Sequence, residues 1–316
     1  MHIIITEDND LPTTKVANLL ESLKEKVLLI DVRDEMELLN FLSRNEMNFR
    51  YKDFNFGLED IKSVWFRRGR IKVKYSYDES PNDKNLQRYH FRVKNEIENF
   101  VNYAIFTKVR TLGNPFKTDL NKLMVNDLAE KIGFNIPKSL LTDRIEDINT
   151  FIENNKEQKI ISKLLIPLHL KENGKKLDFL THTVDMKKLK SNNFTTSFFQ
   201  SQIEKVYEIR SFFLNGKLYS KAIFSQNDQQ TKVDYRNYNL TKPNREVPYN
   251  LPNSLRLKII ELMSELSLNT GSIDLIFSKD KKYYFLEVNP IGQFSDLSFS
   301  CNYNLENKIV EYLNEA

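Results

Sequence analysis

The segment 283–293, YYFLEVNPIGQ, places a carboxylate and an amide within a strand-like run of aromatic and aliphatic residues. Alternate side chains of a strand share a face, so Glu287 and Asn289 should point the same way. The preceding run 272–278, SIDLIFS, reads as a second strand that a charged turn joins to the first. A turn of two or four residues sets Asp274 opposite Glu287, whereas an odd-length turn would separate the two carboxylates.

The even register also predicts which side chains the hairpin buries. It sets Ser278 opposite Tyr283 and puts Phe285 on the same face as Glu287. The opposite, apolar face then holds Ile273, Leu275, Phe277, Tyr284, Leu286 and Val288.

Two directly opposed carboxylates repel each other, so they need a shared proton or a bound cation. Two carboxylates and an amide carbonyl are oxygen ligands of the kind that suits Mg²⁺, which completes its shell with water and phosphate oxygens. The alternative is that both acids are solvated on an exposed face, although their aromatic neighbours argue against full exposure.

Composition narrows the class of protein. At 316 residues the chain can form two or three lobes. The net charge of +4 is too small to indicate nucleic acid as a partner, and the single cysteine, Cys301, excludes an internal disulfide framework. No apolar run approaches the length of a membrane span and the N-terminal residues lack a signal-peptide pattern, so we expect a cytoplasmic protein without a membrane partner.

Hydrophobic patterns predict a mixed α/β fold of α+β lobes, opening with a β-α-β unit and ending in an antiparallel lobe. A helix is expected from Asn114, with Pro115 at its first position, to Gly133. Other expected elements are a helix over about 84–108, a strand over 159–166, a hairpin that turns at Asn215-Gly216, and a helix near 253–268. The polar segment 226–246 is the longest irregular stretch, and loops of such length are often functional.

The sequence contains neither GxxxxGK[ST] nor GxGxxG, so glycine-rich phosphate loops are absent. It also lacks the GxSxG pattern of a nucleophile elbow. Phosphates would therefore have to be held by side chains and a metal ion.

Five segments, in this order, resemble the ATP-grasp ligases: NKLMVNDLAEKIGFNIPKSLLT, IISKLL, FFQSQIEKVYEIRSFF, TGSIDLIF and FLEVNPIGQF. The resemblance covers about 114–316. The first part of the chain, with SVWFRRG, is similar to the N-terminal domain of the graspetide maturases, which include the microviridin-type and grasp-with-spasm enzymes. The resemblance implies an ATP-grasp fold with an N-terminal pre-ATP-grasp domain at 1–113, a central subdomain at 114–190, and a C-terminal subdomain with the metal-binding hairpin at 191–316.

The same resemblance implies roles for individual residues. Lys122 and Lys163 match the lysines that reach the nucleotide phosphates, and Arg210 joins Lys163 as a catalytic residue. The remaining implied roles are an adenine hinge at Ser201, Gln202 and Ile203, a ribose contact at Glu208, and Mg²⁺ ligands, for two ions, at Asp274, Glu287 and Asn289. Two positions depart from the family pattern, because Leu164 replaces a common proline and Ser201 replaces a common glutamate.

Alternatives for single residues remain open at this stage. Lys122 could be a surface lysine, and Arg210 could form a structural ion pair with Glu208 or another acid. Arg67 and Arg68 should face opposite sides of a strand, so at most one of them should face a site.

The resemblance implies an enzyme that uses ATP to activate Asp or Glu side chains of a ribosomal precursor peptide and joins them to Ser, Thr or Lys side chains. Asp234 and Arg236 match a D-x-R element that this branch associates with leader recognition, and a solvated loop is the alternative for Arg236. The implied partner is the precursor peptide, leader and core, and a homodimer is possible. Two other functions are considered: a RimK-like ligase that adds an amino acid to a protein or small molecule, and a non-catalytic binding module. The complete set of metal ligands argues against the last.

Overall fold

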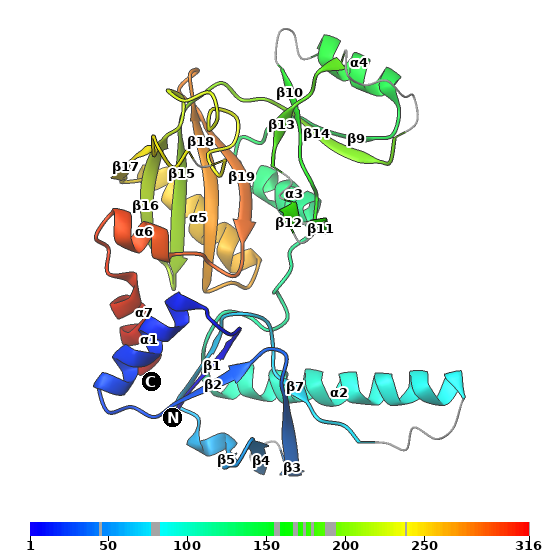
Figure 1. The fold of residues 1–316 in the computed structure, drawn as a ribbon, viewed down its shortest axis with the longest axis vertical. Coiled ribbons are helices and arrows are strands. Elements are labelled where there is room, and N and C mark those ends of the chain that lie inside the picture. The colour runs from blue at the N-terminus through cyan, green and yellow to red at the C-terminus, as the bar shows by residue number, and fades with distance from the viewer. Residues whose placement is uncertain are drawn as a thin grey trace.

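The computed structural model describes residues 1–43, 46–76, 83–154, 159–166, 170–172, 175–177, 180–186, 194–237 and 239–315. Figure 1 shows three parts: an N-terminal domain at the bottom, a large sheet above it, and a smaller sheet at the upper right. Mixed helix and sheet are present in each part, so the predicted α/β class is confirmed.

The N-terminal domain opens with the predicted β-α-β unit. Its sheet has the order β2-β1-β6-β8, and all three strand pairs are parallel. The elements are β1 (His2–Thr6), α1 (Leu11–Ser22), β2 (Val27–Asp31), β6 (Ser63–Phe66) and β8 (Arg110–Leu112). β1 is buried along its whole length, because Ile3 and Ile5 pack into one core cluster and Ile4 into another, on the opposite side. Burial on both faces explains the unbroken apolar run of this strand.

A second sheet of order β5-β4-β3-β7 extends this domain. It is built from β3 (Glu35–Ser43), β4 (Glu46–Tyr51), β5 (Phe54–Gly57) and β7 (Lys72–Val73), with the 3₁₀ turn η1 (Leu58–Asp60) after β5. α2 (Lys84–Lys108) confirms the predicted long helix, and the Asp83 side chain accepts a hydrogen bond from the Asn85 backbone N–H at its start. α2 extends sideways beyond the sheets (Figure 1).

The helix predicted from Asn114 begins later than expected. α3 (Lys122–Ile132) has Asn121 as its N-cap, and the Asn121 side chain accepts hydrogen bonds from two backbone N–H groups. Asn114 instead caps a turn, because its carboxamide oxygen accepts from the Phe116 backbone N–H at 2.9 Å. An Asn-Pro pair suits either a turn or a helix start, which explains the error. Gly133 ends the helix as predicted, with φ of 94°.

The smaller sheet has the order β13-β10-β14-β9. Its elements are β9 (Ser139–Thr142), α4 (Ile145–Asn154), β10 (Ile160–Ser162), β13 (His182–Thr183) and β14 (Ser197–Ser201), and β11 (Leu170–Glu172) and β12 (Lys175–Leu177) form a separate hairpin. β10 is shorter than the strand predicted over 159–166, so Lys163 follows the strand instead of lying within it. β14 pairs with both β9 and β10. It therefore belongs to the same sheet as these strands, although it lies beyond residue 190, the expected end of the central subdomain.

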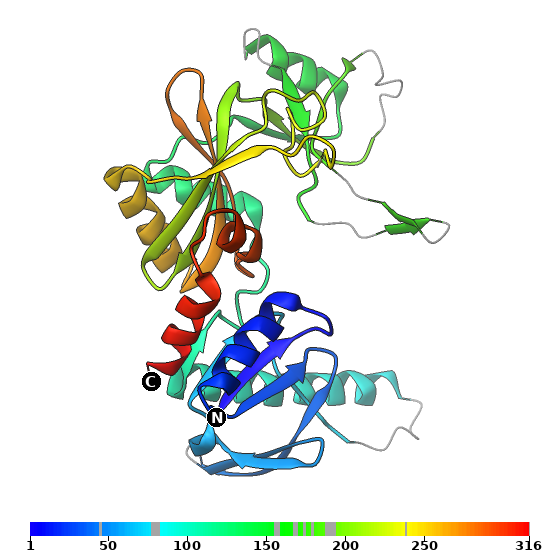
Figure 2. The ribbon, with the colours of Figure 1, turned by 60° about the vertical axis from the view of Figure 1, so that its left-hand side comes forward.

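The large sheet is antiparallel and has the order β17-β16-β15-β18-β19. Its strands are β15 (Lys205–Leu214), β16 (Lys217–Phe224), β17 (Arg245–Pro248), β18 (Thr270–Ser278) and β19 (Tyr283–Asn289). The predicted turn at Asn215-Gly216 is confirmed, because both residues have positive φ. α5 (Asn253–Glu265), the helix expected near 253–268, packs with α3 on one face of the sheet (Figure 2).

The two ends of the chain lie close together in both views, where α7 (Leu305–Asn314) runs beside α1 (Figures 1 and 2). α6 (Ser295–Ser300) connects β19 to α7. One buried cluster joins β1, α1 and β6 to β15 and α7, and includes Trp65, Phe212 and Phe294. The N-terminal domain and the large sheet therefore share a hydrophobic core.

Candidate active site

The β18–β19 hairpin places Asp274 opposite Glu287, as the sequence predicted, but by a different route. The turn is one residue longer than an even turn, so Phe277 and not Ser278 lies opposite Tyr283. A β-bulge then shifts the register back, since Asp274 pairs with Glu287 while Leu275 pairs with Phe285. The two irregularities compensate each other and restore the facing carboxylates.

The bulge also corrects the predicted faces of β19. Phe285 is fully buried in the core with Leu275, instead of sharing the face of Glu287. Leu286 and Glu287 both line the cavity on the opposite side of the sheet. Because the bulge inserts one residue, strict alternation fails at Leu286.

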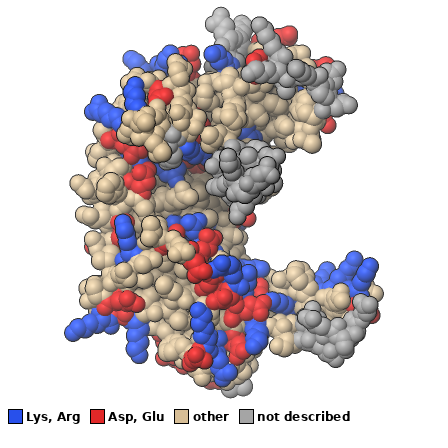
Figure 3. Space-filling model, viewed as in Figure 1, with Lys and Arg blue, Asp and Glu red and all other residues tan. Residues whose placement is uncertain are grey.

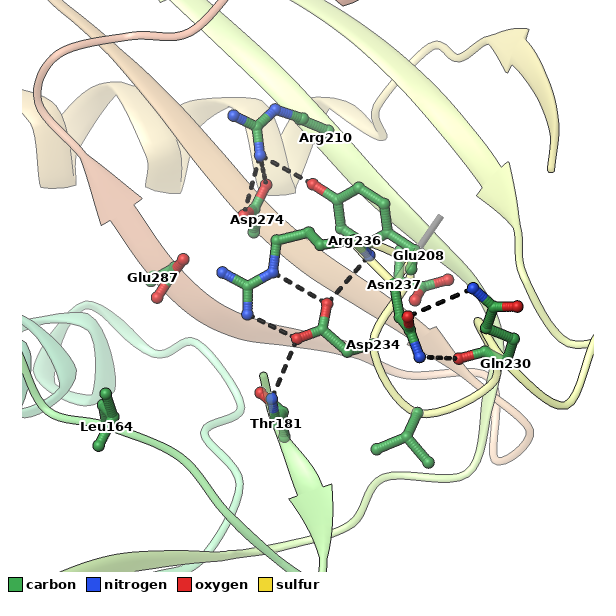
Figure 4. A network of polar contacts seen from close by, with 12 residues as sticks. Leu164, Thr181, Glu208, Arg210, Gln230, Asp234, Arg236, Asn237, Asp274 and Glu287 are labelled. Atoms are coloured by element: carbon green, nitrogen blue, oxygen red, sulfur yellow. Dashed lines mark hydrogen bonds and ion pairs between the residues drawn. The ribbon is translucent and has the colours of Figure 1, made fainter. Parts of the chain in front are cut away.

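Asp274 lies in a partly buried polar cluster (Figure 4). Arg210 Nη1 on β15 is 3.2 Å and 3.3 Å from the two Asp274 carboxylate oxygens, and it also donates to the Tyr235 hydroxyl at 2.8 Å. Arg210 therefore pairs with Asp274 and not with Glu208. Burial raises the pKa of Asp274 despite this cation, and the Glu287 charge raises it further.

Glu287 faces cations from three different elements. Its carboxylate lies 3.3 Å from Lys122 Nζ at the start of α3. Although burial alone would raise the pKa of Glu287, the charges of Lys122, Lys163 and Arg236 hold it below its usual range. Of the two facing carboxylates, Glu287 is therefore the one that stays ionised most readily.

The two predicted phosphate lysines come together beside this hairpin. Lys122 Nζ also donates to the Leu164 backbone carbonyl at 3.3 Å, which joins the start of α3 to the segment after β10. Lys163 Nζ lies 5.7 Å from the centroid of the Phe198 ring. Burial lowers the pKa of Lys163 to about 8, with Lys122 as a further cause. Lys122 is thus a member of the cluster, not an isolated surface lysine.

Asn289 is the third predicted metal ligand and lies opposite Ser272 at the end of the hairpin. Its carboxamide oxygen accepts a hydrogen bond from the Ile291 backbone N–H at 3.0 Å. A carbonyl oxygen has two lone pairs, so this bond leaves capacity for a cation. Within the described residues no group of three or more His, Cys, Asp or Glu could hold a metal, so a metal here would depend on two carboxylates and an amide.

A cavity of about 100 Å³ brings many of the predicted residues together. It is lined by Lys163, Ser201, Ile203, Glu208, Asp234, Arg236, Asp274 and Glu287, among others. A larger cavity of about 530 Å³ adjoins it, and Ile203 and Lys205 line both. Gln202 lines the larger cavity only. Its side-chain carbonyl accepts from the Thr183 hydroxyl at 3.0 Å.

The predicted hinge carries polar atoms without protein partners. The Ser201 hydroxyl and the Gln200 carboxamide oxygen are both buried and unbonded, while Gln200 Nε2 donates to the Ser139 hydroxyl at 2.9 Å. Buried polar atoms are costly when unpaired, so water or a polar ligand in the cavity could satisfy these two atoms.

Glu208 is buried and lines the smaller cavity. It pairs with Lys205 and accepts a hydrogen bond from the Ser225 hydroxyl at 2.6 Å. Burial raises the pKa of Glu208, while Lys205 and Ser225 oppose that shift. Lys205 also donates to the Val233 carbonyl at 2.9 Å, so it ties the irregular segment to the sheet.

Asp234 and Arg236 are oriented toward each other. Arg236 donates from Nε and Nη2 to the two Asp234 oxygens at 2.9 Å and 2.7 Å, and the Thr181 backbone N–H donates to Asp234 at 3.2 Å. The guanidinium of Arg236 lies between Asp234 and Glu287 (Figure 4). Both residues thus lie beside the predicted nucleotide residues, and their role in peptide recognition stays a prediction.

Sequence reasoning missed four residues of this site. Gln200, Lys205, Tyr235 and Gln293 contact the predicted residues or line the cavity. Tyr235 stands between Asp234 and Arg236 in the sequence, and Gln293 follows the predicted ligands closely, so proximity to the motifs was the available signal.

On the face shown in Figure 3, basic and acidic side chains are interspersed, as the small net charge leads one to expect. The same face is hollowed between α2 and the upper part of the molecule (Figure 3). In the described part of the chain, every helix is too short or too polar to cross a membrane.

The fold and site define an ATP-grasp protein. The sequence model of the RimK-like ATP-grasp domain matches residues 119–313, so the chain belongs to that family, and the predicted ATP-grasp fold is confirmed. Curated protein sequences gave no match.

Two solved structures illustrate the likeness over the whole chain. The first is macrocyclase MdnC bound with precursor peptide MdnA, from Microcystis aeruginosa MRC, with 21% identity, TM-score 0.76, and full coverage of both chains. The second is a RiPP-associated ATP-grasp ligase of Chryseobacterium gregarium in complex with ADP and a leader and core peptide. It has 24% identity and TM-score 0.77, and covers 99% of this chain and 94% of that one. At these identities the likeness establishes the fold.

Proposed function

We propose that this protein is an ATP-dependent ligase that links side chains within a ribosomal precursor peptide. It would activate an Asp or Glu carboxylate of the peptide and join it to a Ser or Thr hydroxyl, as an ester, or to a Lys amine, as an amide. The observation that carries the proposal is one cluster in which the facing Asp274 and Glu287 are surrounded by Lys122, Lys163 and Arg210.

The residues of the hairpin fit Mg²⁺. Asp274, Glu287 and Asn289 offer oxygen atoms, the kind of ligand that Mg²⁺ requires. Two facing carboxylates are held together at a cost that a cation would offset. Bound there, Mg²⁺, for which we propose two ions, would neutralise charge on the nucleotide phosphates.

The basic residues are placed for phosphoryl transfer, which depends mainly on positioning and charge neutralisation. We assign Lys122 and Lys163 to the phosphates and Arg210 to the transferred phosphoryl group. A peptide carboxylate oxygen attacks the γ-phosphorus, the bond to the ADP oxygen breaks, and an acyl phosphate forms. A hydroxyl or amine of the same peptide then attacks the acyl carbon and phosphate leaves with one carboxylate oxygen, so the peptide loses one water for each ATP consumed.

Adenine is assigned to the hinge at Ser201, Gln202 and Ile203, and the ribose end to Glu208. The unbonded Ser201 hydroxyl and Gln200 carboxamide support a polar ligand at this position. Glu208, which is enclosed by Lys205 and Ser225, would shape the cavity wall through these bonds.

Peptide recognition is assigned to Asp234 and Arg236. Arginine binds a carboxylate through two parallel hydrogen bonds, and Arg236 holds Asp234 in that way. An acidic side chain of the peptide could replace Asp234 as the partner of Arg236, beside Glu287. The complexes of MdnC and of the Chryseobacterium ligase with peptides support a peptide substrate.

The alternative is a RimK-like ligase that adds an amino acid to a protein or small molecule, and the family match at 119–313 supports it only weakly. The likeness to the peptide-bound ligases extends over the N-terminal domain as well, and this favours the cyclase. We keep the division into 1–113, 114–190 and 191–316, a cytoplasmic location and a possible homodimer as parts of the proposal.

Coexpression with a candidate precursor peptide that has repeated Thr- and acid-rich core segments tests the function. The proposal predicts a product lighter by one water for each link, with fragment masses that join an acidic residue to Ser, Thr or Lys. A mass gain equal to an added amino acid would support the RimK-like alternative, and an unchanged peptide would contradict both.

A further inference from the structure

Arg67 is a buried cation that the proposed chemistry does not use. It follows β6 in the N-terminal domain and is 2% exposed. Its backbone N–H and that of Arg68 both donate to the Ile5 carbonyl, at 3.1 Å and 3.0 Å. The guanidinium lies 5.7 Å from the Trp65 ring and 5.6 Å from the Phe294 ring. A charge so enclosed must have specific partners.

One partner of Arg67 belongs to its own domain. Nε donates to Asp10 Oδ2 at 3.1 Å, and Arg68 Nη2 donates to the other oxygen, Oδ1, at 3.2 Å. Asp10 itself is almost fully buried at the start of α1. The two arginines thus converge on one acid, although the sequence predicted that they face opposite sides of a strand.

The other partners of Arg67 lie more than two hundred residues away in the sequence, in the loop that follows β19. Nη1 donates to the Ile291 carbonyl at 2.8 Å and to the Gly292 carbonyl at 3.3 Å. Gly292 has φ of +66°, and a Cβ there would lie 3.0 Å from the Phe212 ring and 3.3 Å from Gly271 Cα. The loop therefore passes close to the sheet, and its Ile291 and Gly292 carbonyls face Arg67 of the N-terminal domain.

This loop also fixes two groups of the active site. The Ile291 N–H donates to the carboxamide oxygen of Asn289, and Gln293 accepts from Arg210 Nη2 at 3.3 Å. The backbone carbonyl of Gln293 accepts from the Ser272 hydroxyl at 2.9 Å. Arg67 therefore holds the carbonyl of Ile291, whose N–H contacts Asn289, and the carbonyl of Gly292, the residue before Gln293.

We propose that Arg67 is a positioning residue of the metal site, anchored by Asp10, which holds the loop 290–293 so that Asn289 and Arg210 keep their orientation. This inference rests on the proposed function. It gives the N-terminal domain a direct part in forming the site on the large sheet. The planar guanidinium suits the task, because it reaches Asp10 and two carbonyls at once, whereas a lysine offers a single ammonium.

The matched variants are Arg67→Lys and Arg68→Lys, which make the same change at adjacent residues that share Asp10. Mn²⁺ titrated against the full-length protein with ADP, and followed by electron paramagnetic resonance, reports metal affinity without turnover. We expect Arg67→Lys to weaken Mn²⁺ binding about tenfold, the range for residues that orient metal ligands, and Arg68→Lys to change it less than twofold. Hydrogen exchange of the Gly292 and Gln293 amides should quicken in Arg67→Lys alone.

Asp10→Asn tests the same role in a second way, because it weakens the ion pair that anchors Arg67 and keeps the Arg67 guanidinium. It should weaken Mn²⁺ binding in the same direction but by less. Glu287→Gln distinguishes an error in the metal site from an error in the role of Arg67. If Glu287→Gln binds Mn²⁺ like the wild type, the metal site is misassigned and the inference falls with it. If Glu287→Gln loses Mn²⁺ while Arg67→Lys and Asp10→Asn bind it normally, the role of Arg67 alone is overturned.

Discussion

Two lysines, the buried Lys221 and the half-buried Lys163, differ in how completely their charges are paired. Lys221 on β16 is fully buried, and its ammonium contacts Glu246 at 2.6 Å, Asp296 and the Ser300 hydroxyl at 3.4 Å. Lys163 lies beside the cavity, and the pKa of its ammonium is lowered to about 8 chiefly by burial. Lys221 is enclosed by neutralising groups, whereas Lys163 shares Glu287 with another lysine. By this comparison, the charge of Lys221 stabilises the fold, whereas the charge of Lys163 is placed to meet a ligand.

The largest expected effect follows from removing the carboxylate between the lysines. Glu287→Ala should lower ADP release more than about 100-fold, beyond the effect of changing a residue outside the ligand shell. The same change relieves repulsion with Asp274, so the fold should persist. Steady-state ADP release and circular dichroism measure the two effects. Turnover near the wild-type rate in the folded variant would remove Glu287 from the metal site.

Exchanging each of these two lysines for methionine sharpens the comparison. Lys221→Met leaves Glu246 without its buried partner and should lower the free energy of unfolding by ~1–3 kcal/mol, with ATP affinity retained. Lys163→Met removes a partly buried charge that Lys122 repels, and it should leave stability little changed while ATP affinity falls. Thermal melts and nucleotide titrations of both variants test this. Equal losses of stability would erase the distinction between the two lysines.

Arg236→Ala tests the second arginine–carboxylate pair of the cavity. We expect weaker peptide binding, by about 1.5–3 kcal/mol for a charged hydrogen-bonded contact, and little change in ATP affinity of the peptide-free protein. Fluorescence anisotropy with a labelled precursor and a separate ATP titration measure both. Lost ATP affinity with unchanged peptide binding would assign Asp234 and Arg236 to the nucleotide.

The smallest effect concerns the reactivity of Lys163. With its pKa lowered to about 8, a large share of Lys163 is neutral at pH 8, where ordinary lysines are almost fully charged. Mild acetylation at that pH, read by peptide mass mapping, should modify Lys163 ahead of Lys122, and ATP should protect it. Equal labelling with and without ATP would place Lys163 away from the nucleotide.

The sequence was informative where side-chain period and burial agree. The turn is odd and not even, but the bulge restores the pairing of Asp274 with Glu287 that was predicted. The bulge at Leu286 was not predictable, since nothing local distinguishes it from a regular strand residue. The later start of α3 was missed because Asn114 and Pro115 suit a turn as well as a helix.

The tertiary contacts were the least predictable part. Arg67 and the Ile291 carbonyl meet only when the N-terminal domain packs against the large sheet. Likewise, the position of Arg236 between Asp234 and Glu287 depends on the path of an irregular segment that carries no hydrophobic period.

The central claim is that ATP consumption drives condensation within one peptide at the Asp274–Glu287 cluster. The direct measurement is the ratio of ADP released to water lost, using purified protein, purified precursor peptide, Mg²⁺ and limiting ATP, with intact-mass analysis of the peptide. The account predicts one water lost for each ADP formed, and neither product in Glu287→Ala. ADP release with an unchanged peptide mass, or with a mass gain from an added amino acid, would contradict it.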